Sequence, residues 1–124
     1  MIKTMTNAEI YGLSKALNSA FNMEEKYLPA RVNFFISKNK NIISQLAEVI
    51  EESRADIIKH YGVSNEDGTV QVPGDKIELA NGELVDLLNI SQEVEISMVS
   101  LSVLDGLEFT PKQMQALLFM IEED

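Results

Sequence analysis

The longest regular pattern in the chain is a helical one that follows Pro29 and continues to about Tyr61. Steps of three and four residues lead through nine positions, six of them apolar: Val32, Ile36, Asn39, Ile43, Leu46, Ile50, Ser53, Ile57 and His60. This is the spacing of one helix face, whereas a strand alternates with a period of two. Pro29 suits the start of a helix and Gly62 its end. The pattern predicts one uninterrupted helix over residues 29–61.

Such a helix is roughly 45 Å long, whereas a compact chain of this size has a radius of gyration of about 14 Å. The helix therefore spans the molecule or extends beyond it, and its apolar stripe has to be covered. One explanation is packing within the chain. A second is a coiled-coil-like seam of a homodimer, in which Asn39 is the polar residue that sets the register. A third is cover by another partner.

Capping signals mark a first and a last helix. Thr6 and Glu9 form a Thr-x-x-Glu capping box, which predicts a helix over about residues 7–21. A short link through residues 22–28 then favours an antiparallel arrangement of this helix against the long one. Near the other end Thr110 caps a final helix, and Pro111 occupies its first position. The buried stripe predicted for this helix is Met114, Leu117, Leu118 and Ile121.

The segment between residues 63 and 109 has shorter patterns. Residues 65–68 have turn composition, and Pro73-Gly74 predicts a type II turn between strands 69–72 and 76–79. Asn81 is suited to cap a short helix at about 82–89. Strict alternation over residues 93–98 predicts a strand with inward side chains at Val94, Ile96 and Met98.

Together these elements predict a helix-rich α+β fold. One long central helix packs with N- and C-terminal helices and a small antiparallel sheet. The 124 residues predict a single domain over 1–124, made of a helical hairpin (1–62), a hairpin, short helix and strand (63–109) and a C-terminal helix (110–124).

The net charge of −10 is concentrated in the second half of the chain. Residues 1–62 hold eight Lys/Arg against seven Asp/Glu, but residues 63–124 hold two against thirteen. Direct nucleic-acid binding is disfavoured because it depends on cations that neutralise phosphates. A protein partner with a basic surface is favoured instead, although acidic faces also serve solubility alone. The candidate partner-binding residues are Glu66, Asp67, Glu78, Glu83, Asp86, Glu93 and Glu95.

The sequence offers almost no chemistry. It has no cysteine and a single histidine, His60, which rules out thiol catalysis and a histidine metal cluster within one chain. Neither a Gly-x-Ser-x-Gly motif nor a phosphate-binding loop occurs. Glu51 and Glu52 are adjacent on the predicted helix, so they point in different directions and do not converge on one ion. We expect no enzyme, no cofactor and no metal. Because no apolar run is long enough for a membrane span and the first residues do not form a signal peptide, we also expect a cytosolic protein.

Several stretches in their order along the chain resemble a family of short phage and prophage proteins of Gram-positive bacteria, a domain of unknown function. These stretches are Leu28-Pro29, Ile36-Ser37-Lys38-Asn39, Tyr61-Gly62, Glu66-Asp67-Gly68, Val94-Glu95-Ile96, Thr110-Pro111 and residues 117–123. The resemblance covers most of the chain, and the closing segment is its most specific part. It implies a phage setting and transfers no activity or functional residue.

Three functions are compatible with these observations. The first is a non-enzymatic protein that binds a host macromolecule through its acidic surface, such as a host-defence antagonist. The second is an adaptor or chaperone of virion tail or head assembly, which works through apolar residues such as Phe34 and Ile58. The third is a small-molecule-sequestering protein. A phosphate-bearing ligand would then require nearby cations from the set Arg31, Lys38, Lys40 and Arg54.

Overall fold

A computed structural model of the chain describes residues 1–21 and 28–123. Its helices are α1 (Asn7–Ala20), α2 (Ala30–Tyr61), α3 (Ile77–Asn89) and α4 (Pro111–Leu117). Its strands are β1 (Ile2–Thr6), β2 (Val63–Ser64), β3 (Val70–Gln71), β4 (Ser91–Glu95), β5 (Val99–Ser100) and β6 (Ile121–Glu122). The predicted helix-rich α+β class is confirmed.

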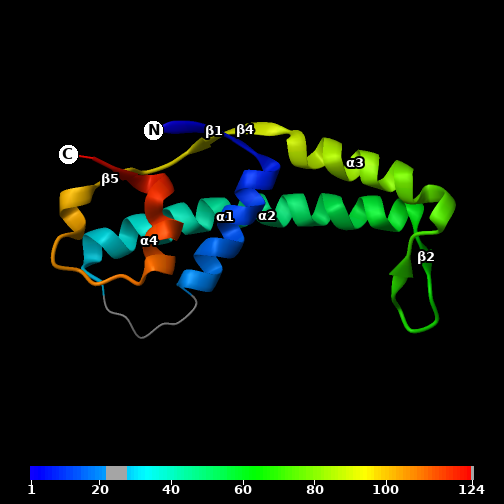
Figure 1. Cartoon of the computed structure of the whole chain (residues 1–124), viewed down its shortest axis with the longest axis horizontal. Coiled ribbons are helices and arrows are strands. Elements are labelled where there is room, and N and C mark those ends of the chain that lie inside the picture. Colours follow the sequence, from blue (N-terminus) through cyan, green and yellow to red (C-terminus); the bar gives the residue numbers. More distant parts are fainter. Residues whose placement is uncertain (22–27, 124) are drawn as a thin grey trace.

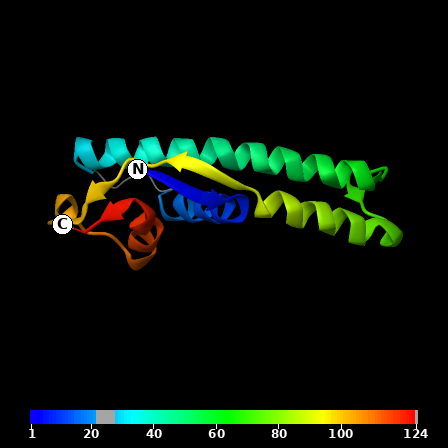
Figure 2. The same ribbon diagram turned by 90° about the horizontal axis from the view of Figure 1, so that it is seen from above.

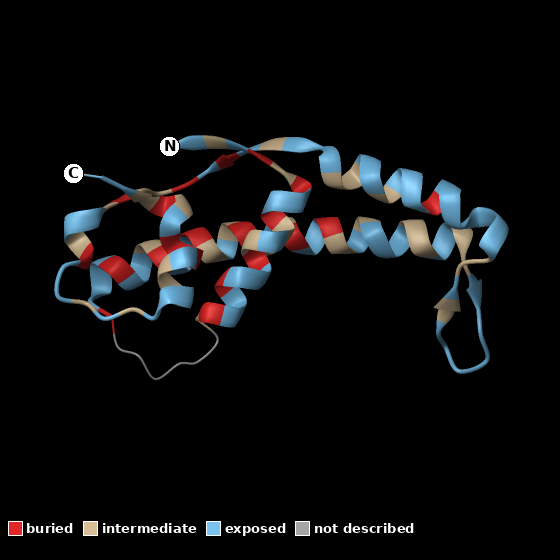
Figure 3. Ribbon diagram, in the orientation of Figure 1, coloured by how far each residue is buried: buried red, intermediate tan, exposed pale blue. Residues whose placement is uncertain are grey.

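Helix α2 runs the length of the molecule and divides it into two parts (Figure 1). The first half of α2 is surrounded by α1, α4 and the strand pairs β1–β4 and β5–β6. We call this part of the molecule the head. Its second half pairs with α3 and ends in the β2–β3 hairpin, and we call residues 51–90 the arm. Figure 3 shows buried residues concentrated in the head. Within the arm Ala80 is the only buried residue, so the arm has almost no core of its own.

The long helix is confirmed as one unbroken element. Its buried residues are Val32, Ile36, Asn39, Ile43, Ala47 and Ile50. The predicted stripe continues beyond Ile50, but Ser53 and Ile57 are only half-buried and His60 is exposed. The stripe is less buried beyond Ile50, because α1 no longer packs on α2 there and α3 lies beside it.

Helix α1 begins at the predicted capping box, in which Thr6 and Glu9 satisfy each other's backbone groups. Figure 1 shows that α1 crosses α2 obliquely and does not lie alongside it, as a simple antiparallel pair would. Two hydrogen bonds hold the start of α1 against the end of α3. The Asn7 N–H donates to the Ile90 carbonyl (2.8 Å), and the Asn7 side chain donates to the Leu87 carbonyl (2.8 Å). The predicted link through residues 22–27 lies outside the described residues.

Strand β1 is an element that the sequence pattern did not predict. It pairs antiparallel with β4 in a register that runs from Ile2 opposite Glu95 to Thr6 opposite Ser91. The predicted strand over 93–98 is therefore shifted to Ser91–Glu95. Val94 and Ile96 are buried as expected, while Met98 is half-buried. Together with α1, α2 and α4, this strand pair contributes buried side chains to the core of the head.

The predicted hairpin of strands 69–72 and 76–79 is wrong. Strand β3 pairs instead with β2, across a turn in which Asp67 accepts hydrogen bonds from the backbone and hydroxyl of Thr69 and Gly68 has a positive φ of 88°. Pro73 precedes a 3-10 turn (Gly74–Lys76) that leads directly into α3. Ala80, Leu84 and Leu88 are spaced four residues apart and lie on the face of α3 that packs on α2. Residues 77–79 belong to this helix, and Asn81 lies inside it.

The final helix starts at the predicted capping box of Thr110 and Gln113, with Pro111 at its first position. It is shorter than predicted, because a 3-10 turn (Leu118–Met120) follows and leads to β6, which pairs parallel with β5. The tighter turn rotates the later side chains, so Leu118 is 60% exposed where burial was predicted, and Met120 is buried.

Candidate interaction surface

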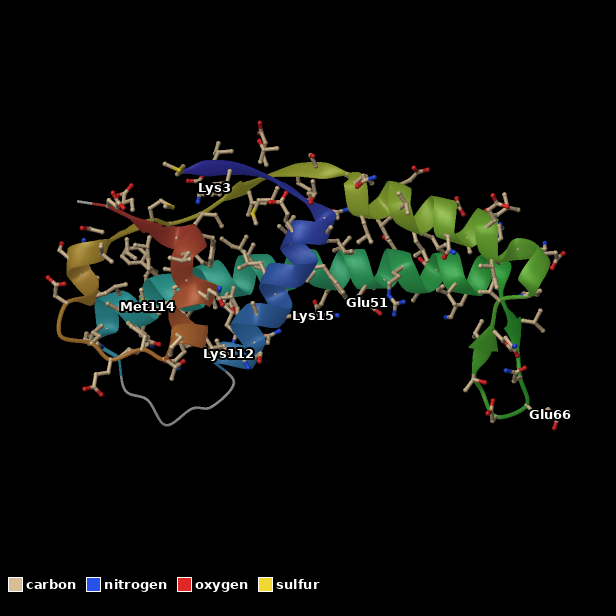
Figure 4. All side chains as sticks on the ribbon, in the orientation of Figure 1. Lys3, Lys15, Glu51, Glu66, Lys112 and Met114 are labelled. Carbon is tan, nitrogen blue, oxygen red and sulfur yellow. The ribbon has the colours of Figure 1, made fainter. Side chains whose placement is uncertain are left out.

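The seven acidic residues proposed from the sequence are all exposed, but they form three groups. Glu66 and Asp67 lie in the turn of the β2–β3 hairpin, at the far end of the arm (Figure 4). Glu78, Glu83 and Asp86 lie on α3, and Glu93 and Glu95 lie on β4. Because β4 follows α3 directly, the last two groups form one continuous surface, which we call the α3–β4 surface. In Figure 1 the hairpin pair lies below α2 and α3 lies above it, and the length of α3 separates the hairpin from Glu93 and Glu95 on β4.

Helix α3 supplies apolar as well as acidic side chains to this surface. One face packs against α2 through buried Ala80 and half-buried Leu84, Leu87 and Leu88. The other faces carry Leu79, which is 59% exposed, and Val85, which is 55% exposed. Leu79, Glu83 and Asp86 follow one another at steps of four and three, so they share a flank of the helix. This flank of α3 therefore combines an exposed apolar side chain with two carboxylates.

Strand β4 presents its two carboxylates on one side. Glu93 and Glu95 flank buried Val94, so both point away from the core. Thr4 and Ile2 lie directly opposite them on β1. The outward side of this strand pair therefore carries two acids among polar and apolar neighbours.

The carboxylates of this surface are poorly neutralised. Within residues 1–21 and 28–123, none of the seven forms an ion pair with Lys or Arg. Glu95 lies 3.4 Å from the amino group of Met1. Hydrogen bonds from Thr69 lower the pKa of Asp67, and a hydrogen bond to Glu83 raises the pKa of Tyr61. The surface keeps a negative potential that a basic partner could neutralise.

The structure also reveals a polar cluster between α1 and α2 that the sequence analysis did not identify. Glu51 accepts hydrogen bonds from the Tyr11 hydroxyl (2.8 Å) and from two guanidinium nitrogens of Arg54 (3.0 and 2.9 Å). The Lys15 ammonium lies 4.6 Å from the centre of the Tyr11 ring (Figure 4 labels Lys15 and Glu51). Arg54, followed by Tyr11, lowers the pKa of Glu51 to about 2. The i,i+3 spacing of Glu51 and Arg54 was visible in the sequence, but the contribution of α1 was not.

Glu51 is thus held by an ion pair with Arg54 within α2 and by a hydrogen bond from Tyr11 across the helix crossing. Its neighbour Glu52 is exposed and does not share these partners. In the described part of the chain, no group of three or more His, Asp or Glu side chains is placed to hold a metal ion.

Asn39 corrects the expectation of a dimer seam along the buried stripe. Its side chain is fully buried, and its amide bonds to the backbone of Ser97 and to the Met120 sulfur within the same chain. The residue joins α2 to the segment between β4 and β5. It is therefore not available to set the register of a second copy.

A shallow groove of about 360 Å³ lies between α1 and α4 in the head. Leu13, Ala16, Lys112, Gln115 and Ala116 line it. None of the four cations proposed for a phosphate-bearing ligand lies among these residues, and Arg54 is already paired with Glu51. The groove therefore offers one cation and a mostly apolar wall.

The fold and its surfaces define a small helix-rich α+β protein with an extended two-helix arm. No known protein family, curated protein or solved structure matches the chain. Among the described helices, none is both long and apolar enough to cross a membrane.

Proposed function

We propose that the chain is a non-enzymatic phage or prophage protein that works by binding a basic surface of a host macromolecule in the host cytoplasm. Antagonism of a host defence protein is one form of this activity that is compatible with a phage setting. The observation that carries the proposal is the α3–β4 surface, where five exposed carboxylates have no Lys or Arg partner among the described residues and lie beside exposed Leu79 and Val85.

The physical argument rests on the pairing of charge with apolar area. Uncompensated carboxylates steer a cationic partner towards the surface and exclude acidic ones. Exposed Leu79 and Val85 supply the desolvated contacts that convert an encounter into a stable complex. A surface kept acidic for solubility alone does not need large apolar side chains among its carboxylates.

The test is affinity capture from a lysate of the host bacterium at low and high salt. The variant Asp86→Lys with Glu93→Lys reverses two exposed charges of the α3–β4 surface. The control Asp105→Lys with Glu108→Lys makes the same change of net charge at exposed positions before α4. We expect the first variant and high salt to release a partner that the control retains. Capture that is indifferent to both would contradict the proposal.

A second candidate is an adaptor or chaperone of virion tail or head assembly. The exposure of Phe34 (59%), Leu79 and Val85 favours it, because apolar contacts would dominate such binding. Ile58, named with Phe34 from the sequence, is half-buried in the arm. Mass spectrometry of purified virions distinguishes the two candidates, since a structural component is present in stoichiometric amounts.

A third candidate, small-molecule sequestration, is supported only by the groove between α1 and α4. Exchange of Lys112 for Ala should weaken retention of an anionic ligand there. Arg31→Ala and Arg54→Ala test the alternative location, and unaltered retention in these two variants would exclude it.

We also propose that the chain forms a homodimer through the long helix, on a face other than the one that holds Asn39.

A further inference from the structure

The face of α2 opposite its buried residues is not covered by any other part of residues 1–21 and 28–123. Figure 2 shows α2 as the uppermost element of that view, with the head and α3 below it. The exposed residues of this face follow one another at steps that fit a single helix face: Arg31, Phe34, Lys38, Gln45, Val49, Glu52 and Asp56. We call them the outer face. Phe34 is 59% exposed and Val49 is 60% exposed, which is unusual for large apolar side chains on a solvated helix.

The charges along α2 are divided between its two halves. Residues 30–47 contain three cations, Arg31, Lys38 and Lys40, and no acid. Residues 48–61 contain four acids against Arg54 and Lys59. Arg54 is bonded to Glu51, and among the described residues neither Glu52 nor Asp56 of the outer face has an ion-pair partner. The outer face is therefore basic at the head and acidic on the arm.

We infer that the outer face of α2 binds a second copy of the chain in an antiparallel, twofold-symmetric arrangement. A twofold axis near Gln45 places Lys38 opposite Glu52 of the second copy, because the two positions are equally far from residue 45. It places Arg31 within about one turn of Asp56 of the second copy. The symmetry forms each attraction twice.

Apolar groups meet in the same arrangement. Val49 of each copy falls beside the half-buried Ile42 of the other, close to the axis. A parallel arrangement would set Lys38 against Lys38 and Glu52 against Glu52, which is repulsive. The pairing of Lys38 with Glu52 therefore favours the antiparallel orientation over the parallel one, although Arg31 then lies opposite Lys59 of the second copy.

The expected dimer is weak. With 32 residues α2 is about 48 Å long, and a strip about 10 Å wide along it buries roughly 1,000 Å² over both copies. Specific interfaces usually bury about 1,200–2,000 Å². Association should therefore depend on protein concentration, and it should weaken with salt because its charges lie at the rim of a narrow strip.

Charge reversal tests this inference with sedimentation velocity on the full chain. Variant A, Arg31→Glu with Lys38→Glu, makes the outer face acidic throughout. Variant B, Glu52→Lys with Asp56→Lys, makes it basic throughout. We expect the wild-type chain to dimerise at low salt and each variant alone to have a dissociation constant raised at least about tenfold. A mixture of A and B should form a heterodimer, and the four substitutions in one chain should restore the homodimer.

The control is Asp105→Lys with Glu108→Lys, which matches the charge change of variant B away from α2 and should dimerise as the wild type does. Circular dichroism checks that each variant keeps its helix content. A wild-type chain that stays monomeric at high concentration and low salt would overturn the inference. So would a dimer that persists in A and B alone. The inference does not rest on the host partner proposed above, since neither the lysate capture nor Asp86 and Glu93 enters this test.

Discussion

The side-chain amide of Asn39 bonds to both backbone groups of Ser97. Its Oδ1 accepts from the Ser97 N–H at 2.9 Å, and its Nδ2 donates to the Ser97 carbonyl at 2.8 Å. In this way one helix residue does for Ser97 what a neighbouring strand would do. The bond pair holds the irregular step between β4 and β5 against α2, at the centre of the head.

Replacement of Asn39 by Leu should destabilise the fold markedly. The substitution nearly conserves volume but leaves the Ser97 N–H and carbonyl without partners, at about 1–3 kcal/mol for each buried group. We expect the free energy of unfolding to fall by about 2–5 kcal/mol in urea or thermal denaturation. Asn41→Leu, two positions away on the exposed side, is the control and should change stability by about 0.5 kcal/mol or less. Equal effects of the two substitutions would contradict the role assigned to Asn39.

Glu51 should make the stability of the helix crossing pH-dependent in acid. Its pKa is about 2 in the folded chain against an ordinary 4.5, so folding favours the ionised form. The resulting stabilisation is present above about pH 4.5 and is lost as the pH falls towards 2. The effect should be modest, because the Glu51 side chain is 42% exposed.

The measurement is denaturant unfolding of the wild type and Glu51→Gln across this pH range, with the Glu51 carboxyl followed by NMR. The stability difference between the two proteins should shrink as the pH decreases. Tyr11→Phe keeps the ring but removes one hydrogen bond, so it should raise the pKa of Glu51 part of the way. A Glu51 pKa near 4.5 in the wild type would refute this prediction.

Two glycines should respond to alanine in opposite directions. A Cβ at Gly62 would collide with Val70 and would lie 2.6 Å from the Ile58 carbonyl oxygen, so Gly62→Ala should cost about 1–3 kcal/mol. Gly82 lies inside α3 and a Cβ there meets nothing within 4 Å. Gly82→Ala should therefore stabilise the chain by about 0.5–1 kcal/mol through helix propensity. Thermal denaturation of both variants checks the prediction, and a stabilised Gly62→Ala would show that the hairpin does not pack there.

The arm should open more readily than the head. Ala80 is its only buried residue, whereas α2 before residue 51 has six. Hydrogen exchange followed by mass spectrometry, at low protein concentration and high salt, should show amides of α3 exchanging at least about tenfold faster than those of residues 36–50. Uniform protection along α2 and α3 would mean that the arm is stabilised by contacts other than those described.

The elements that the sequence predicted correctly depend on local chemistry. The capping boxes at Thr6 and Thr110 act within one turn, and the apolar spacing of α2 extends over many turns. Strand β1 was missed because Lys3 faces inward and donates to the Phe119 carbonyl, while Ile2 faces outward. The alternation is therefore reversed at Ile2 and Lys3, although Thr4 is exposed and Met5 is buried, and the pairing with β4 makes the segment a strand.

The hairpin and the candidate site show the same division. Pro73 and Gly74 favour a turn on their own, but contact with α2 extends α3 back to Ile77. The exposure of the acidic residues followed from their charge, whereas their separation into three groups depends on the length of α3. The hydrogen bonds between Asn39 and Ser97 join residues that are 58 positions apart, so no local sequence pattern predicts them.

The pairings of β1 with β4 and of β6 with β5 have a consequence for the order of folding during synthesis. Residues 91–100 contain β4 and β5, the partners of β1 and β6. They leave the ribosome long after β1 and about twenty residues before β6. The arm, whose helices are near neighbours in sequence, can assemble while translation is still under way. The head is complete only after β6 has been synthesised. Until then β1 and the apolar side of α1 stay exposed, and they are the parts of the nascent chain that a chaperone would bind.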